Sequence, residues 1–138
     1  MGVASEDVFT RPSQFFYQVV AGDCDKYNHL NHASSFQILE RARWKALGDW
    51  DHPEDEVIKS GIGPVIISIK AEFRKEIRMN ESLEVFTHAE LLNRRFFYIH
   101  QRVEVNKILR LRATFKHGLF SLDTRSLVLI PESWSRIF

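Results

Sequence analysis

The sequence is poor in cysteine, in net charge and in long apolar runs, and each shortage excludes a class of protein. Its single cysteine, Cys24, excludes an intrachain disulfide, which fits a reducing compartment. The formal net charge of +1 gives no general electrostatic case for binding nucleic acid or an anionic membrane. No apolar stretch approaches the roughly 20 residues of a membrane span. We therefore expect a soluble, cytoplasmic protein.

The N-terminal segment MGVASEDVFTRPSQ also lacks the features of a targeting signal. It has neither an apolar signal core nor a run of arginines. The 138 residues are enough for one well-buried core, and no repeat, low-complexity run or linker divides them. We expect a single domain over residues 1–138, in which residues 1–12 form a loose leader.

The first half of the chain predicts a strand followed by a long helix. Residues 14–21 are aromatic and β-branched, which favours a strand, and residues 25–30 are polar and rich in turn-forming types. A stripe of apolar residues at helical spacing then predicts a helix from residue 31 or 32 to Leu47, with Gly48 as its C-terminal stop. Pro53 and the three acids after it predict a short second helix.

The second half of the chain changes to an alternation of apolar and polar residues, which is typical of strands with one buried face. Asn106-Lys107 is a candidate two-residue hairpin turn, and a polar tail is expected after Pro131. An antiparallel sheet curled around one long helix buries both elements, so the predicted class is α+β. The predicted strands cover residues 65–74, 83–92, 97–105, 109–122 and 127–130.

The stretch GDCDKYNHLNHASSFQILERAR, residues 22–43, combines features that suit thioester chemistry. Two acids lie one residue apart at the end of a predicted strand, a polar turn follows, and a helix then begins. A carboxylate at the strand end can attack a carbonyl or activate water. The unpaired backbone N–H groups of a helix N-terminus can hold the oxyanion that develops.

The same stretch resembles the signature of the hotdog-fold acyl-CoA thioesterases, in particular the 4-hydroxybenzoyl-CoA thioesterase-like group. In that group a D-x-D ends the strand, a GHVNN-like turn follows and an E-x-A-R lies on the helix. The matching residues here are Asp23-Cys24-Asp25, Asn28-His29-Leu30-Asn31-His32 and Glu40-Arg41-Ala42-Arg43. The resemblance covers nearly the whole chain. It implies a hotdog fold, hydrolysis of an acyl-CoA, coenzyme A as part of the substrate, and no metal or redox cofactor.

Asp25 matches the second acid of the family motif, and the resemblance therefore implies that it is the catalytic carboxylate. The alternative from the residues themselves is that Asp25 caps the following turn or helix. Asp23 would share a strand face with Asp25 while the strand stays extended, and we expect a structural role for it. Cys24 lies between two carboxylates that disfavour a thiolate, so we expect a buried thiol and no catalytic cysteine.

The turn after Asp25 supplies candidates for holding the substrate. By resemblance, the backbone N–H of His32 points at the thioester carbonyl, Asn31 is a candidate N-cap, and His29 would orient the turn. A metal site formed with Asp25 is disfavoured, because these residues lie in one turn and no second ligand cluster is identifiable. Glu40 is a candidate alternative acid, since other hotdog thioesterases place a helical carboxylate in the site. Its competing interpretation is an ion pair with Arg43.

Arg94 and Arg95, with Lys75 and Arg78, are candidates for binding the phosphates of coenzyme A, although charged turns are usually just solvated. The sequence departs from the motif at Asn28, where a glycine is usual.

His32 is a second departure, because it stands at the second Asn of the motif, and Ser35 stands where a tyrosine is often found. The changes at Asn28 and His32 lie next to the site, so they can alter substrate preference or leave the activity weak or absent. Because the same fold serves other functions, three alternatives stay open. These are an acyl-carrier-protein thioesterase, a non-catalytic acyl-CoA-binding module and an acyl dehydratase, whose different histidine motif we do not find. Exposed edge strands, and the intersubunit sites of the resembling family, predict a homodimer or homotetramer.

Overall fold

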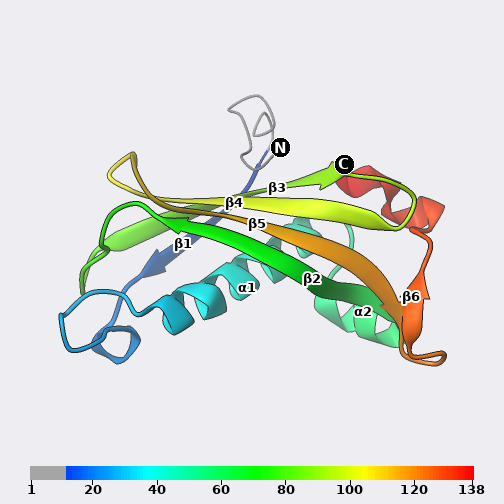
Figure 1. Ribbon diagram of the computed structural model, residues 1–138, viewed down its shortest axis with the longest axis horizontal. Coiled ribbons are helices and arrows are strands. Elements are labelled where there is room, and N and C mark those ends of the chain that lie inside the picture. Colours follow the sequence, from blue (N-terminus) through cyan, green and yellow to red (C-terminus); the bar gives the residue numbers. More distant parts are fainter. Residues whose placement is uncertain (1–11) are drawn as a thin grey trace.

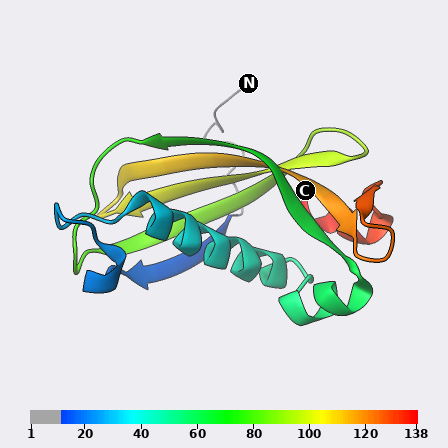
Figure 2. The ribbon, with the colours of Figure 1, turned by 60° about the horizontal axis from the view of Figure 1, so that its bottom comes forward.

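The computed structural model describes residues 12–138, so the predicted leader lies outside the described residues except for Pro12. A six-stranded antiparallel sheet curves around one long helix, α1 (His32–Asp49), which lies along the inner face of the sheet (Figures 1 and 2). The predicted α+β class, with a sheet wrapped around a single helix, is confirmed. The strands are β1 (Ser13–Gln18), β2 (Ile62–Phe73), β3 (Ser82–Leu91), β4 (Phe96–Val105), β5 (Ile108–Ser121) and β6 (Ser126–Val128).

The strand order in the sheet is β1-β3-β4-β5-β2, and β6 pairs with β5. Short turns join β3 to β4 and β4 to β5, as the sequence predicts. Asn106 and Lys107 both have positive φ, 51° and 65°, which is the conformation that a tight two-residue hairpin turn requires. The helix α2 (Glu54–Ser60) follows α1 and leads directly into β2. Within residues 12–138, no helix is long and apolar enough to cross a membrane.

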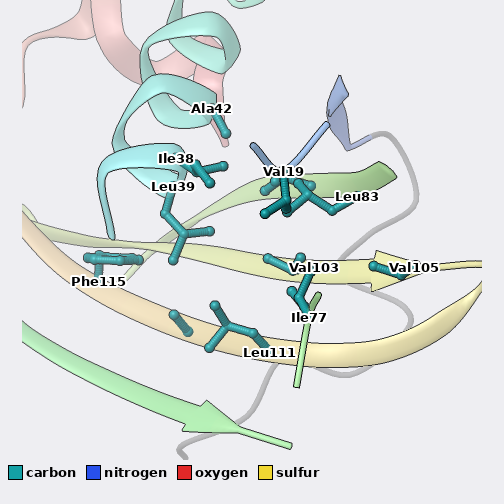
Figure 3. Packing of buried hydrophobic residues seen from close by; sticks show 12 residues of the cluster. Val19, Ile38, Leu39, Ala42, Ile77, Leu83, Val103, Val105, Leu111 and Phe115 are labelled. Atoms are coloured by element: carbon teal, nitrogen blue, oxygen red, sulfur yellow. The ribbon is translucent and has the colours of Figure 1, made fainter. Parts of the chain in front are cut away.

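The core lies between α1 and the sheet and consists of two hydrophobic clusters. In β3 and β4 every second side chain is buried against the helix, which is the alternation that the sequence pattern predicts. Figure 3 shows Leu39 of α1 pointing at the sheet above Phe115 and Leu111 of the first cluster. The second cluster lies towards the C-terminal end of α1 and contains Leu47, Val57, Ala89, Phe97, Ile99, Leu119, Trp134 and Ile137.

The strand β2 forms one edge of the sheet and carries apolar side chains that are exposed to solvent. Its inward-facing residues Ile66, Ile69 and Phe73 are 43%, 47% and 55% exposed. These three pair in register with His117, Phe115 and Leu111 of β5, whose side chains are buried. A long apolar edge of this kind is prone to pair with another strand.

Two helix and strand ends differ from the sequence prediction. The helix α1 continues through Gly48 to Asp49, and the amide of Trp50 donates to the carbonyls of Ala46 and Leu47. Gly48 was predicted as the stop, but the left-handed residue that ends the turn is Asp51, with φ of 69°. β1 ends at Gln18, because residues Ala21–Asp23 form a short 3-10 helix, η2, instead of extending the strand.

The C-terminal segment is the other departure, because it is not the polar tail that the sequence predicts. β6 is shorter than expected, and residues Glu132–Ile137 form a 3-10 helix, η3, which buries Trp134 and Ile137. The indole of Trp134 stacks on the imidazole of His52 with ring centroids 4.2 Å apart. His52 Nε2 also lies 3.0 Å from the carbonyl oxygen of Ser133. The two apolar residues of η3 were too few to give a periodic signal among their polar neighbours.

Candidate active site

The turn between β1 and α1 is closed by its own backbone. The amide of Asp25 donates to the carbonyl of His29 at 3.0 Å, and the amide of Asn28 donates to the carbonyl of Asp25 at 3.1 Å. Asn28 has φ of 61°, in the left-handed region. Asparagine tolerates this conformation better than most residues, so the backbone keeps its shape where the motif usually has glycine.

Asp25 is held by this turn and still presents a free carboxylate oxygen. Its Oδ1 accepts hydrogen bonds from the amides of Tyr27 at 2.9 Å and His29 at 3.4 Å. Its Oδ2 accepts no hydrogen bond from residues 12–138, and the side chain is half-buried. Asp25 therefore caps the turn with Oδ1 alone. Because Oδ2 is left free, Asp25 can cap the turn and also react through Oδ2.

Asp23 has a different environment, although it lies only two residues away. Its Oδ2 accepts a hydrogen bond of 2.7 Å from the Tyr17 hydroxyl and one of 3.0 Å from the amide of Val20. The hydrogen bond to Asp23 also raises the pKa of Tyr17. Because η2 replaces an extended strand here, the basis for the expected shared face of Asp23 and Asp25 is lost. These contacts occupy one oxygen of Asp23 in local structure, and its purely structural role stays a prediction.

Cys24 is a thiol with no sign of activation. Burial raises its pKa, and the charges of Asp23 and Asp25 raise it further. Its Sγ lies 3.6 Å from the carbonyl oxygen of Val20 and donates there. Both effects disfavour the thiolate that a catalytic cysteine needs. The side chain is half-buried, where we had expected it to be buried.

The N-terminus of α1 offers unpaired amides beside the turn. Asn31 is the N-cap, as predicted: its Oδ1 accepts from the amide of Ala33 at 2.7 Å, and its carbonyl accepts the first helical hydrogen bond from Ser35. The amides of His32 and Ser34 find no acceptor in the described part of the chain. Free N–H groups and the positive end of the helix dipole suit a developing negative charge.

A cleft of about 310 Å³ opens beside this helix start. Leu30, Ser35 and His29 line it, and Nε2 of His29 lies 3.4 Å from Glu76 Oε1. Arg110 closes one wall by donating to the carbonyl of Glu76 at 2.6 Å and pairing with Glu81 at 3.3 Å. The remaining lining residues are Phe73, Arg74, Lys75, Glu76, Ile77 and Leu111.

The predicted phosphate-binding cations are divided between the two ends of the sheet. Lys75 lines the cleft, and Arg78 lies next to it, where its Nε pairs with Glu76 at 2.8 Å. Arg94 and Arg95 lie in the exposed turn between β3 and β4, near the C-terminus and at the opposite end of the protomer from the Asp25 turn (Figure 1). One protomer therefore brings Lys75 and Arg78 to the site, but not Arg94 and Arg95.

Glu40 and Arg43 do not form the ion pair that their spacing suggested. Glu40 is exposed on α1, whereas Arg43 turns into the interior and donates from Nη1 to Gln101 Oε1 at 3.1 Å. The sequence analysis gave this arginine no role of its own. Its position within the apolar stripe of α1, one turn from Leu39 and Leu47, was the available signal for burial. Within residues 12–138, no group of three histidine, cysteine, aspartate or glutamate side chains is placed to hold a metal ion.

Solved structures of other proteins share this architecture. The chain is similar to a 1,4-dihydroxy-2-naphthoyl-CoA thioesterase from Synechocystis, with 17% identity, a TM-score of 0.82 and coverage of 91% of this chain and 95% of that one. A hypothetical protein from Aquifex aeolicus gives 22% identity, a TM-score of 0.84 and coverage of 91% and 98%. A hypothetical protein from Staphylococcus aureus, in complex with CoA, gives 13% identity, a TM-score of 0.83 and coverage of 91% and 80%. At these identities the likeness shows the shared hotdog fold.

The comparison with protein-family models shows the family of the chain in addition to its fold. No match to a curated protein was found. A family model described as the thioesterase-like superfamily matches residues 19–138, which include the Asp25 turn, α1 and the strands β2 to β6. The chain therefore belongs to the thioesterase-like superfamily.

Proposed function

We propose that this protein is an acyl-CoA thioesterase that hydrolyses its substrate to a free acid and coenzyme A. The observation that carries the proposal is the juxtaposition at the start of α1. Asp25, a carboxylate with one free oxygen, begins the turn that leads into two unpaired helix amides, those of His32 and Ser34. Membership of the thioesterase-like superfamily supports this chemistry. The fold by itself would not, because one fold hosts many activities.

In the nucleophilic form of the reaction, Oδ2 of Asp25 attacks the thioester carbonyl carbon. The carbonyl oxygen becomes an oxyanion, which the amides of His32 and Ser34 stabilise. The C–S bond then breaks, the thiolate of coenzyme A leaves and takes a proton from water, and an acyl–aspartyl anhydride remains. Water hydrolyses the anhydride and restores the carboxylate. In the general-base form, Asp25 takes a proton from a water molecule that attacks the same carbon, and no anhydride forms.

The phosphates of coenzyme A would lie over the cationic side of the cleft. Arg74 and Lys75 line that side, and Arg78 is next to it. Arginine and lysine side chains suit phosphate oxygens. The complex of CoA with the Staphylococcus aureus protein of the same fold is consistent with a ligand of this type. We propose no metal or redox cofactor, because the two mechanisms need only Asp25, the helix amides and water.

We further propose that the active protein is a homodimer, or a homotetramer built from it, in which β2 pairs with β2 of a second copy. The free backbone edge of β2 would then be closed by hydrogen bonds between the two copies, while Ile66, Ile69 and Phe73 stay on its inward face, towards α1. Antiparallel self-pairing brings the opposite end of the partner beside the cleft. Arg94 and Arg95 of the partner subunit would in this way come nearer to the coenzyme A. The single cysteine fits a cytoplasmic location.

A hydrolysis screen over short, long and aromatic acyl-CoAs, with release of free thiol as the readout, tests the proposal. Turnover above that of a heat-killed sample is expected for at least one class. If no acyl-CoA is hydrolysed but acyl-carrier-protein thioesters are, the carrier in the proposal is wrong. Binding of acyl-CoA without any hydrolysis would replace the enzyme with a non-catalytic binding module.

A further inference from the structure

A row of buried polar side chains crosses the interior between the two hydrophobic clusters. Thr87 on β3 pairs in register with Gln101 on β4, and both are buried between apolar neighbours on their strands. His117 on β5 and Arg43 on α1 continue the row towards the β2 edge, and both are buried. Burying a polar group costs free energy unless the group is hydrogen-bonded or ion-paired. The hydrogen-bond partners of each residue therefore show which group in this row is left without a partner.

The side-chain amide of Gln101 makes hydrogen bonds through both its nitrogen and its oxygen, and it holds Arg43 in place. Its Nε2 donates to the carbonyl of Leu39 at 3.0 Å and to Thr87 Oγ1 at 3.1 Å. These two bonds fix the amide so that Oε1 faces Arg43 and accepts from Nη1 at 3.1 Å. The guanidinium carbon of Arg43 lies 4.0 Å above the centre of the Phe115 ring. The side chain of Arg43 is therefore positioned, and only 8% of the residue is exposed.

The charge of Arg43 has no counter-charge in the described part of the chain. Its guanidinium forms no ion pair with a carboxylate of residues 12–138, and its hydrogen bond with these residues is the one from Nη1 to Gln101. Burial lowers the pKa of Arg43 to about 10, so the group is still protonated at neutral pH. His117 adds no second positive charge beside Arg43, because burial lowers its pKa to about 4 and keeps it neutral at neutral pH; its Nδ1 lies 3.1 Å from the carbonyl oxygen of Phe115. Glu40 acts on Arg43 only through its field.

An open apolar strip leads from the cleft to this cation. It follows the inward side of β2, from Phe73, which lines the cleft, past Ile69 to Ile66. Ile69 is paired with Phe115, the residue beneath Arg43, and Ile66 with His117. On the side of α1, Phe36 bounds the strip, with its ring 6.2 Å from that of Phe73 and 6.3 Å from that of Phe115.

The strip has the length of an extended acyl chain. From the start of α1 at His32 to Arg43 the helix advances about 17 Å. An extended chain gains about 1.2 Å per bond, so this distance corresponds to on the order of a dozen bonds or slightly more. A thioester held at the start of α1 would therefore place the far end of a long acyl chain level with the guanidinium.

We infer that Arg43 recognises the far end of the acyl group, and that the substrate is a long acyl-CoA whose chain ends in a hydrogen-bond acceptor, best a carboxylate. This rests on the proposed function and specifies its substrate class. A terminal carboxylate would supply the missing counter-charge and accept from Nε and Nη2. A terminal methyl group would leave the buried charge unpaired and remove its contact with solvent, which disfavours an ordinary fatty chain.

The test is a comparison of matched thioesters on the wild-type protein. The coenzyme A monothioesters of dodecanedioic, tetradecanedioic and hexadecanedioic acids are compared with dodecanoyl-, tetradecanoyl- and hexadecanoyl-CoA. We expect kcat/KM for at least one diacid thioester to exceed that of its monoacid partner by about tenfold or more. If the monoacid is hydrolysed as well or better at every length, the inference is overturned and the thioesterase function stands.

Variants then assign the preference to Arg43. Arg43→Met should reduce the preference for the diacid at least tenfold and improve hydrolysis of the monoacid, while Arg43→Lys keeps part of the preference. Arg41→Met is the matched control, because it removes the same charge from the exposed side of α1, where Arg41 lies over the Tyr17 ring at 5.3 Å. Circular dichroism checks that each variant is folded. An unchanged preference in a folded Arg43→Met protein would contradict the inference.

A second measurement separates this inference from the proposed function. If none of these six thioesters is hydrolysed but another acyl-CoA of the screen is, the inference is overturned and the thioesterase proposal stands. If no acyl-CoA is hydrolysed at all, the thioesterase proposal fails, and calorimetric binding of the same three pairs decides the inference. Tighter binding of the diacid thioester by the wild-type protein, abolished in Arg43→Met, would support Arg43 as the recognition group of a binding module. Equal binding of both members of every pair would reject it.

Discussion

The carboxylate of Asp23 accepts a hydrogen bond of 2.7 Å from the hydroxyl of Tyr17, and this contact separates the tasks of the two acids in the motif. The same oxygen accepts from the amide of Val20 at 3.0 Å, so Asp23 closes the end of β1 onto η2. Asp25 is tied only through Oδ1, and its Oδ2 is free of contacts with the described residues. Two carboxylates two residues apart therefore differ in availability because the chain turns between them.

Asp25→Asn should abolish turnover and leave the fold intact. Oδ1 survives the substitution and still accepts from the amides of Tyr27 and His29, so the turn keeps its hydrogen bonds. The free oxygen is replaced by an uncharged NH₂ group, which can neither attack a carbonyl nor take a proton. We expect kcat to fall by at least about a hundredfold. Steady-state kinetics on the best substrate, with circular dichroism as a check of folding, measures this.

Two isosteric substitutions serve as controls for this variant. Asp23→Asn and Glu40→Gln should both reduce kcat less than Asp25→Asn does. Retention of more than about a tenth of the wild-type kcat by Asp25→Asn would show that Asp25 is not the catalytic carboxylate. If Glu40→Gln is then the inactive protein, the mechanism based on an acid of the helix replaces the one proposed above.

Asn31→Ala should lower both stability and turnover. It removes the acceptor of the Ala33 amide at 2.7 Å, and the loss of an N-cap of this type costs about 1 kcal/mol of unfolding free energy. For a chain of this size we expect Tm to fall by about 4 °C. Turnover should fall further than stability explains, because the amides of His32 and Ser34 lose their fixed geometry. Asn31→Asp is the matched variant, since it keeps the acceptor. Equal kcat in Asn31→Ala and the wild-type protein would argue against the helix amides as the oxyanion site.

His117 should make the protein lose stability on mild acidification. Burial lowers its pKa to about 4 in the folded protein, against an ordinary value of about 6.5 in the unfolded chain. As the pH falls from about 6.5 to about 4, the unfolded chain binds a proton that the folded one does not, so the free energy of unfolding decreases by about 3 kcal/mol. Below about pH 4 both states are protonated and this loss stops. Burial also lowers the pKa of His88, so His117→Gln should remove only part of the dependence.

Chemical denaturation at pH 7 and at pH values down to about 4 measures the effect. His117→Gln should be less stable than the wild-type protein at neutral pH, since it disturbs the stacking of the imidazole on Phe97 at 5.3 Å between ring centroids. The difference between the two proteins should shrink as the pH falls. A difference that stays constant over this range would mean that His117 does not remain neutral in the folded state.

Elements with a repeated signal were predictable from the sequence, and single-residue exceptions were not. The alternation in β3 and β4 and the helical stripe of α1 reflect burial at every second or every third to fourth residue, which many residues report together. The end of α1 depends on one conformation, and that conformation is adopted by Asp51 and not by the glycine three residues earlier. The burial of Trp134 depends on a stacking partner, His52, more than eighty residues away in the chain.

In the candidate site too, features set by local sequence were predictable, and features set by distant contacts were not. The N-cap at Asn31 was predictable, because capping is local and has a sequence signature. That Asp23 and Asp25 have different partners was not, because the contact of Asp23 with Tyr17 requires η2 to bend the chain. The burial of Arg43 was missed for a third reason: a charged residue in an apolar stripe is usually assigned to the surface. Only Gln101, on a strand far away in the sequence, identifies the direction in which it points.

The last prediction concerns the edge of the sheet. Ile69→Lys should prevent association, because Ile69 is 47% exposed near the middle of the edge strand β2, and a lysine on an edge strand disfavours pairing with a second edge. Multi-angle light scattering should give at least twice the 16.2 kDa chain mass for the wild-type protein and the single-chain mass for the variant. Leu91→Lys is the matched control, since it adds the same charge at another exposed apolar residue, on β3, away from this edge. We also expect Ile69→Lys to weaken turnover, because the strip beside α1 loses an apolar side chain and because Arg94 and Arg95 of the partner subunit would no longer approach the cleft. A wild-type protein that stays at the single-chain mass at micromolar concentration would refute pairing through β2, and an active single-chain variant would show that one protomer holds the complete site.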